Sequence, residues 1–151
     1  MRIAIGSDHA GYELKERLKK YLVTRGHEVI DKGCVSTESN DYPDFSEAVA
    51  LEVANKSCEY GIVICGTGIG VSIVANKVPG IRSALCLSKE MAYLARAHND
   101  ANVIALGARI KLIDEVEDIV ITFITSSFEG GRHKKRVEKL KTIEEKFRCK
   151  Q

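Results

Sequence analysis

The chain has 151 residues, of which 44% are hydrophobic and 29% charged, and its net charge at pH 7 is +2. These values are typical of a globular protein and exclude a strongly basic nucleic-acid-binding protein. No apolar run approaches the ~20 residues that a membrane-spanning helix needs, and the apolar start is too short for a secretory signal. The five cysteines include no Cys-x-x-Cys pair, which favours a reduced, cytoplasmic protein.

The first half of the chain alternates short apolar runs with helical periodicity. Residues 2–6 and 27–31 are expected to be strands, and residues 12–25 between them place leucines at helical spacing. After a polar loop, residues 45–55 carry apolar side chains on one helix face. Residues 62–64 form a third apolar run, which predicts a buried strand that ends at a cysteine.

The second half continues this alternation. A glycine-rich loop leads into a helix over residues 71–77, and residues 81–87 are expected to form the fourth strand. A serine then caps a helix over residues 89–97. Residues 98–102 are expected to be a polar turn, and residues 103–106 the fifth strand.

Two further helices are expected at the end of the chain. Residues 112–124 have apolar side chains at helical spacing, whereas residues 132–150 are highly charged. The last helix has only a narrow apolar stripe, made of Val137, Leu140, Ile143 and Phe147. A stripe this thin is not typical of a core helix, so we expect residues 132–150 to dock on a surface such as that of a partner subunit.

Strands that alternate with helices predict parallel βαβ units, with helices on both faces of one sheet. The predicted fold class is therefore α/β: a three-layer, doubly wound sheet of five parallel strands with an extra C-terminal helix. We expect residues 1–151 to form a single domain.

The most informative stretch follows the third strand and reads Cys65-Gly66-Thr67-Gly68-Ile69-Gly70. The carboxyl end of a strand is where open α/β sheets bind ligands. Glycines let the backbone approach a ligand closely, and neighbouring amides can hold an anion and stabilise a thiolate. Cys65 is therefore a candidate nucleophile or general base; the alternative is a buried, small hydrophobic residue in a simple turn.

This loop lacks the signatures of nucleotide and phosphotransfer sites. Val71 stands where a dinucleotide fingerprint needs its third glycine and where a phosphatase C-x5-R loop needs arginine. The turn from Gly6 to Gly11 has P-loop spacing, but it continues with Tyr12-Glu13 where lysine and a hydroxyl residue are required. Most nucleotide-binding and phosphotransfer functions are therefore excluded. The histidines show no metal-ligand spacing with the cysteines, so no structural zinc is expected.

Polar residues elsewhere add candidates, each with a structural alternative. Asp8 and His9 follow the first strand, where Asp8 could act in acid–base chemistry or cap a helix, and His9 could contact an anion or close the turn. His98 and Asn99 precede the fifth strand and so belong to the opposite edge of the sheet, unless they reach the site of a neighbouring molecule. On its own, His98 is best explained as a residue that interacts with the helix dipole.

Arginines near the end of the chain suit an anionic ligand. Arg132 and Arg136 are four residues apart and share one helix face, which fits bidentate phosphate binding. A solvated charged face is the alternative explanation, and it applies equally to Arg109.

Taken together, these residues resemble the ribose-5-phosphate isomerase type B family, which also includes allose- and galactose-phosphate isomerases. The resemblance extends in unbroken order from residue 1 to about residue 140. The matching stretches are Gly6-Ser7-Asp8-His9-Ala10-Gly11, Asp41-Tyr42-Pro43-Asp44-Phe45, Cys65-Gly66-Thr67-Gly68-Ile69-Gly70, Gly80-Ile81-Arg82, His98-Asn99-Asp100-Ala101-Asn102 and Gly107-Ala108-Arg109, with Arg132 and Arg136.

The resemblance implies an aldose–ketose isomerase without metal or cofactor, which acts on a phosphorylated sugar. It also implies the strand order 2-1-3-5-4 and a homodimer that builds each site from two subunits. By the same resemblance, Cys65 transfers the proton between C1 and C2. The amides of Gly66, Thr67, Gly68, Ile69 and Gly70, with the Thr67 hydroxyl, hold the enediolate oxygen.

The remaining roles are implied in the same way. His98 assists ring opening with Asp8, and Asn99 holds the sugar. The phosphate is bound by Arg132, Arg136, His9 and Arg109. The leading expectation is interconversion of ribose 5-phosphate and ribulose 5-phosphate. The alternatives are a six-carbon aldose 6-phosphate isomerase of the same family and a non-catalytic sugar-phosphate-binding module.

Overall fold

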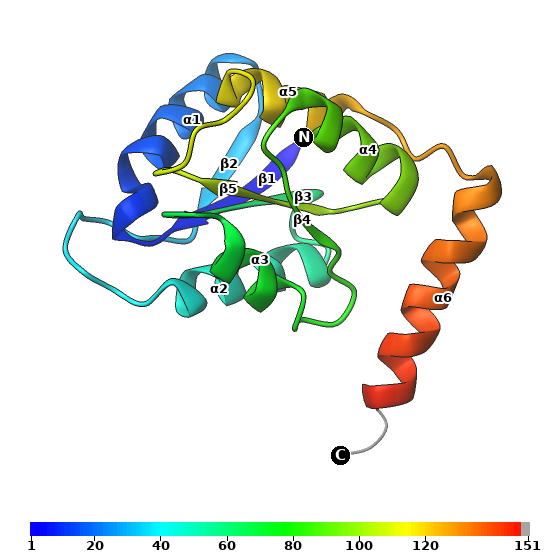
Figure 1. Cartoon of the computed structure of the whole chain (residues 1–151). Coiled ribbons are helices and arrows are strands. Elements are labelled where there is room, and N and C mark those ends of the chain that lie inside the picture. Colours follow the sequence, from blue (N-terminus) through cyan, green and yellow to red (C-terminus); the bar gives the residue numbers. More distant parts are fainter. Residues whose placement is uncertain (149–151) are drawn as a thin grey trace.

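The computed structural model describes residues 1–148 and contains a five-stranded sheet with helices on both faces (Figure 1). The strands are β1 (Arg2–Ser7), β2 (Glu28–Asp31), β3 (Tyr60–Cys65), β4 (Ser83–Leu85) and β5 (Val103–Gly107). Every pair of neighbours is parallel, and the order is β2-β1-β3-β5-β4. The predicted doubly wound α/β fold and its strand order are therefore confirmed.

The helices form a layer on each face of this sheet. They are α1 (Tyr12–Thr24), α2 (Tyr42–Ala54), α3 (Ile69–Ala75), α4 (Lys89–Asn99), α5 (Val116–Thr125) and α6 (Gly131–Arg148), with a short 3₁₀ turn, η1 (His9–Gly11), before α1. In Figure 1, α1, α4 and α5 cover one face, while α2 and α3 cover the other.

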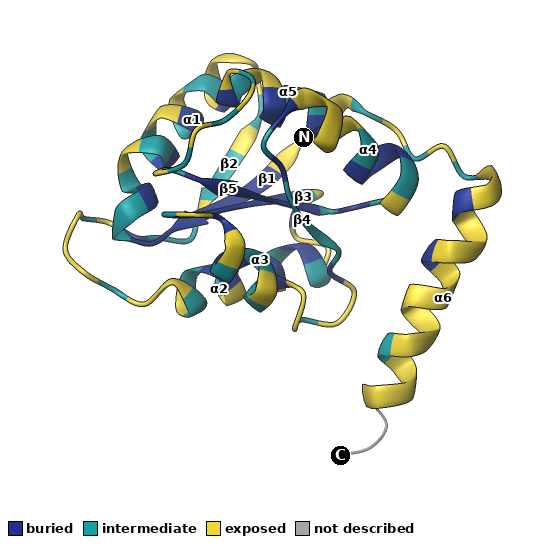
Figure 2. Cartoon of the chain, in the orientation of Figure 1, coloured by how far each residue is buried: buried dark blue, intermediate teal, exposed yellow. Residues whose placement is uncertain are grey.

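The central strand β3 separates two hydrophobic cores. Ile62 and Ile64 pack with the apolar faces of α1, α4 and α5. Val63 and Cys65 point the other way and pack with α2 and α3. Successive side chains of a strand alternate between faces, so a strand buried on both sides is apolar throughout. Figure 2 shows this continuous burial along the middle of the sheet.

Among the helix starts, those of α2 and α5 differ most from the sequence-based expectation, while α3 begins at Ile69 rather than at residue 71. Helix α2 begins at Tyr42 rather than at residue 45, because a proline in the first turn is compatible with a helix start. Helix α5 begins at Val116 rather than at residue 112. The segment before it is held as a loop, since the Ile113 N–H donates to Leu87 O at 2.8 Å and Asp114 accepts the Lys89 N–H at 2.7 Å.

Two differences lie around the fourth strand. β4 pairs with β5 over only three residues, because the Arg82 N–H is taken by Asn102 Oδ1 at 2.8 Å. The expected polar turn over residues 98–102 is wrong at its start: α4 continues through His98 and Asn99. Asp100 caps the helix end after Asn99 and takes a left-handed conformation with φ of 48°.

Helix α6 stands away from the sheet and contacts the rest of the chain mainly through α4 (Figure 1). Val137 is buried, whereas Leu140, Ile143 and Phe147 are 46%, 55% and 62% exposed. The apolar stripe therefore remains largely uncovered in one chain. The expected end of this helix, at residues 149–150, lies outside the described residues, as does Cys149. No helix in residues 1–148 is long and apolar enough to cross a membrane.

Candidate active site

Cys65 is the last residue of β3, and its side chain is held by the loop that follows. The thiol is only 5% exposed, and the Gly68 N–H donates to Sγ at 3.1 Å. Gly68 has φ of 77°, a conformation that side chains disfavour and glycine adopts freely. The strand end is fixed as well, because the Ala108 N–H donates to Cys65 O at 2.8 Å. The loop thus presents a backbone amide to the sulfur.

The glycines of the loop differ in how closely they are packed. A Cβ on Gly68 would lie 2.6 Å from Leu85 Cδ1, and one on Gly70 would lie 2.7 Å from the Tyr42 ring. By contrast, a Cβ on Gly66 would have its nearest neighbour, Arg109 Cδ, at 3.5 Å. Gly66 is therefore less tightly packed than Gly68 and Gly70, and Thr67 and Ile69 of the same loop are exposed.

Asp8, His9 and Arg109 meet at the same edge of the sheet as Cys65. Asp8 is buried, and its Oδ1 accepts the Gly11 N–H at 3.1 Å, so the capping role weighed from the sequence is present. The Arg109 N–H donates to Gly66 O at 2.9 Å, which ties its segment to the glycine loop.

The segment before α2 also reaches this edge. The His9 N–H donates to Asn40 Oδ1 at 3.0 Å, and the Asn40 N–H donates back to His9 Nδ1 at 3.4 Å. Asn40 was not a candidate from the sequence. It lies in a polar loop, and no local pattern marks its contact with η1.

The second group of candidates gathers around the end of α4. A cavity of about 320 Å³ is lined by His98, Asn99, His133, Arg136, Val137 and Leu140. The rings of His98 and His133 are stacked, with centroids 4.0 Å apart and planes at 9°. Arg132 is exposed beside them, and its Nε–H donates to His133 Nε2 at 3.3 Å. His98, Asn99 and the two arginines thus lie together.

The two groups are separated by the length of the sheet. Cys65 is paired with Gly107, at the carboxyl end of β5, whereas His98 and Asn99 precede Val103, at its amino end. The four residue steps from Val103 to Gly107 extend over ~13 Å. One chain therefore brings Cys65, Thr67, Asp8, His9 and Arg109 together, and His98, Asn99, Arg132 and Arg136 together, but it does not join the two groups.

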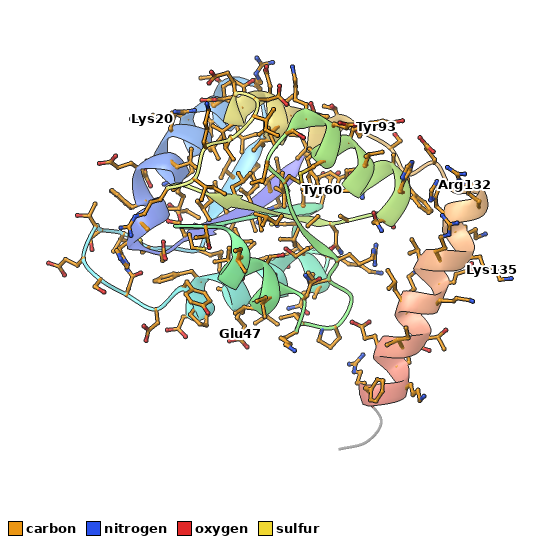
Figure 3. The ribbon with its side chains drawn as sticks, viewed as in Figure 1. Lys20, Glu47, Tyr60, Tyr93, Arg132 and Lys135 are labelled. Atoms are coloured by element: carbon orange, nitrogen blue, oxygen red, sulfur yellow. The ribbon has the colours of Figure 1, made fainter. Side chains whose placement is uncertain are left out.

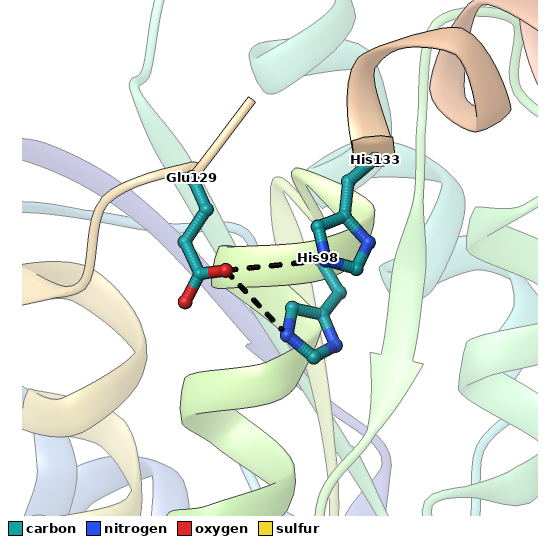
Figure 4. A group of neighbouring side chains, drawn as sticks. All are labelled: His98, Glu129 and His133. Carbon is teal, nitrogen blue, oxygen red and sulfur yellow. Dashed lines mark ion pairs between the residues drawn. The ribbon is translucent and has the colours of Figure 1, made fainter. Parts of the chain in front are cut away.

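Glu129 and His133 are further polar residues at the second group, as Figure 4 shows. Glu129 Oε2 lies 3.7 Å from His98 Nε2 and 3.9 Å from His133 Nε2. These three ligand-type atoms lie within 4.8 Å of one another. However, the Nε2 lone pair of His133 already accepts a bond from Arg132, and the adjacent guanidinium groups would repel a cation. The arrangement therefore favours acid–base use of this group over metal binding.

Burial lowers the pKa of His133 below its usual value, and the neighbouring His98, Arg132 and Arg136 lower it further. His133 is thus neutral near pH 7. Neither His133 nor Glu129 was a candidate site residue from the sequence. Their contact with His98 depends on how α6 packs on α4, which no local pattern reveals.

Comparisons with known proteins identify relatives of this chain. Residues 3–140 match the family model described as Ribose/Galactose Isomerase. Ribose-5-phosphate isomerase B of Escherichia coli is 47% identical over 145 residues, which cover 96% of this chain and 97% of the relative. A putative sugar phosphate isomerase of Bacillus subtilis is 42% identical, with 97% and 99% covered.

Solved structures show the same similarity. Ribose-5-phosphate isomerase B of Clostridium thermocellum superimposes with a TM-score of 0.94 and is 54% identical, covering 97% of this chain and 99% of that one. The type B ribose 5-phosphate isomerase of Trypanosoma cruzi gives a TM-score of 0.91 at 42% identity, with 97% and 99% covered. The chain belongs to the ribose/galactose isomerase family.

Proposed function

We propose that the chain is an aldose–ketose isomerase that interconverts ribose 5-phosphate and ribulose 5-phosphate. The observation that carries this proposal is the buried Cys65 thiol, which receives the Gly68 N–H at 3.1 Å at the carboxyl edge of the sheet. The names and titles of the relatives, which describe ribose-5-phosphate isomerases B, support the same substrate pair.

The proposed reaction proceeds through an enediolate. Cys65, as thiolate, removes the proton from C2 of the opened aldose, and the electron pair of that C–H bond forms the C1–C2 double bond. Negative charge develops on the oxygen at C1, where the amides of residues 66–70 and the Thr67 hydroxyl stabilise it. The proton of the C2 hydroxyl passes to the oxygen at C1. The thiol then returns its proton to C1, the electron pair of the C1–C2 double bond forms the new C–H bond, and C2 becomes the carbonyl carbon of the ketose. A fixed base and fixed dipoles are the two requirements of this chemistry.

Ring opening and phosphate binding fall to the remaining candidates. His98, assisted by Asp8, opens the sugar ring, and Asn99 holds the sugar. Arg132 and Arg136, with His9 and Arg109, bind the phosphate through charge-assisted bonds. A phosphate held far from C1 and C2 supplies binding energy that orients the reacting carbons.

These roles require two copies of the chain, and we propose a homodimer. The ~13 Å of strand between the two groups prevents one chain from surrounding a single sugar. A twofold-symmetric dimer can place the Cys65 edge of one copy against the His98 edge of the other. The half-exposed side chains of Leu140 and Ile143 give α6 an apolar face for this contact, as residues 132–150 were expected to have. On this proposal residues 1–151 act as a single domain.

A reducing compartment suits this site. Cys34, Cys58, Cys65 and Cys86 are free thiols, and the proposed base must stay reduced. We infer that the protein works in the cytoplasm.

Deuterium incorporation at C2 tests the proposal. The protein is incubated with ribose 5-phosphate in D₂O, and the expected result is exchange that Cys65→Ala abolishes. Cys58→Ala is the matched control. That thiol is also buried, but it lies just before β3, at the opposite end of the strand from the glycine loop. Exchange that survives Cys65→Ala unchanged would eliminate the thiol as base. Exchange with allose 6-phosphate alone would favour the six-carbon alternative, and binding without exchange the non-catalytic one.

A further inference from the structure

Glu129 is held at the end of α4 by two bonds. Its backbone N–H donates to Ala97 O at 3.0 Å, in the turn that carries His98. The Tyr93 hydroxyl donates to Glu129 Oε1 at 2.7 Å, and this bond raises the pKa of Tyr93 above its usual value. One carboxylate oxygen is thus occupied, and the other, Oε2, is directed towards the stacked imidazoles (Figure 4).

The two imidazoles that face Glu129 differ in whether Nε2 can donate a hydrogen bond. An arginine side chain only donates hydrogen bonds, so the contact from Arg132 Nε requires His133 Nε2 to be an acceptor. His133 is therefore neutral, with its proton on Nδ1, and presents no N–H to the carboxylate. His98 Nε2, at 3.7 Å, is the nitrogen whose proton can face Glu129 Oε2.

We propose that Glu129 is a positioning residue for His98. Glu129 is fixed by its hydrogen bonds to Tyr93 and Ala97 O, and it keeps the proton of the His98 imidazole on Nε2. The neutral ring of His133 stacks on the same imidazole. Nδ1 of His98 is then the ring's proton acceptor, held in one orientation. This inference rests on the proposed function, because His98 has a catalytic task only if a sugar ring is opened.

Several charged and titratable groups surround His98. They are Glu129, Arg132, His133, Arg136, Arg82 and Asp100. Arg82 and Asp100 bond to each other at 2.9 Å, which leaves Glu129 as the carboxylate directed at the imidazole. Glu129→Gln therefore removes the anion that orients the His98 ring.

The test compares Glu129→Gln with wild type in turnover of ribose 5-phosphate and in NMR relaxation of the His98 ring carbons. Glu129→Gln is expected to lower kcat about tenfold, to leave KM within about twofold, and to increase ring mobility, since orientation rather than binding is lost. Glu129→Asp should restore part of kcat, and Tyr93→Phe should show a smaller loss. The matched control is Glu47→Gln, an exposed carboxylate of α2 on the other face of the sheet from Tyr93 (Figure 3).

The outcomes separate this inference from the proposed function. A Glu129→Gln variant with unchanged mobility of the His98 ring overturns the positioning role, even if kcat falls. A lower melting temperature with the same fall in kcat and no change in ring mobility also overturns it, because it indicates a structural role. If wild type does not turn over any sugar phosphate, the proposed function fails, whereas the ring mobility still decides whether Glu129 holds His98.

Discussion

Gly68→Ala should strain the backbone of the glycine loop and lower the stability of the protein. Gly68 has φ of 77°, and its added Cβ would lie 2.9 Å from the backbone carbon of Leu106. A left-handed conformation costs an alanine ~1–2 kcal/mol, and overpacking against a backbone that cannot move costs ~1–3 kcal/mol. We therefore expect a loss of about 3 kcal/mol of unfolding free energy, or roughly 6–12 °C in melting temperature for a chain of this size.

Activity should fall more steeply than stability in the same variant. The Gly68 N–H donates to Cys65 Sγ, and Gly68→Ala keeps this N–H but displaces it together with the strained backbone. Loss of one oxyanion-type donor typically costs about 10²–10³ in kcat. The control for stability is Gly66→Ala, whose Cβ meets nothing closer than 3.5 Å. Thermal unfolding and turnover of ribose 5-phosphate measure both effects. Equal melting temperatures for the two variants would refute the packing argument, and full activity in Gly68→Ala would refute the role of the loop.

Three further predictions concern capping, ion pairs and metals. Ser88→Ala should cost about 1 kcal/mol in urea unfolding, because Ser88 Oγ accepts the Met91 N–H at 3.1 Å; an unchanged midpoint would contradict the cap. Burial opposes ionisation of Asp31, but hydrogen bonds from Lys15 and Lys19 outweigh it and lower the pKa of Asp31. The contribution of the ionised carboxylate to folding stability is therefore present at pH 7 and lost as the pH falls below ~4. Asp31→Asn should therefore lower the free energy of unfolding by about 2 kcal/mol at pH 7. This difference from wild type should shrink towards pH 3. A difference that does not change with pH would contradict the role of the ion pairs. Dialysis against EDTA should leave turnover unchanged, since thiol and amides perform the proposed chemistry; loss of activity reversed by a divalent ion would contradict it.

The fold and the Cys65 half of the site follow from local patterns. Apolar runs between helical segments predicted all five strands, and the glycines after Cys65 predicted the strand–loop–helix turn. These features depend on residues that are near one another in the chain, so short-range reasoning finds them.

Tertiary contacts explain what local patterns missed. The end of α4 extends through His98 because Asp100 is bonded by Arg96 at 2.9 Å and by Arg82 at 2.9 Å, which stabilises its left-handed cap. The stacking of His98 on His133 depends likewise on the packing of α6 against α4. Arg82 is 18 residues from Asp100, and His133 lies on a different helix from His98. Only Arg96 is near its partner in sequence, at i,i+4 from Asp100.

On the proposed function, an isomerase site is assembled from the Cys65 edge of one copy and the His98 edge of another. Cys65→Ala and His98→Ala proteins, each inactive alone, are co-expressed with different tags, and the hybrid dimers are purified. Each hybrid contains one site with both native residues, so we expect about half of wild-type turnover per dimer, as twofold symmetry requires. Hybrids as inactive as their parents would contradict a site shared between subunits.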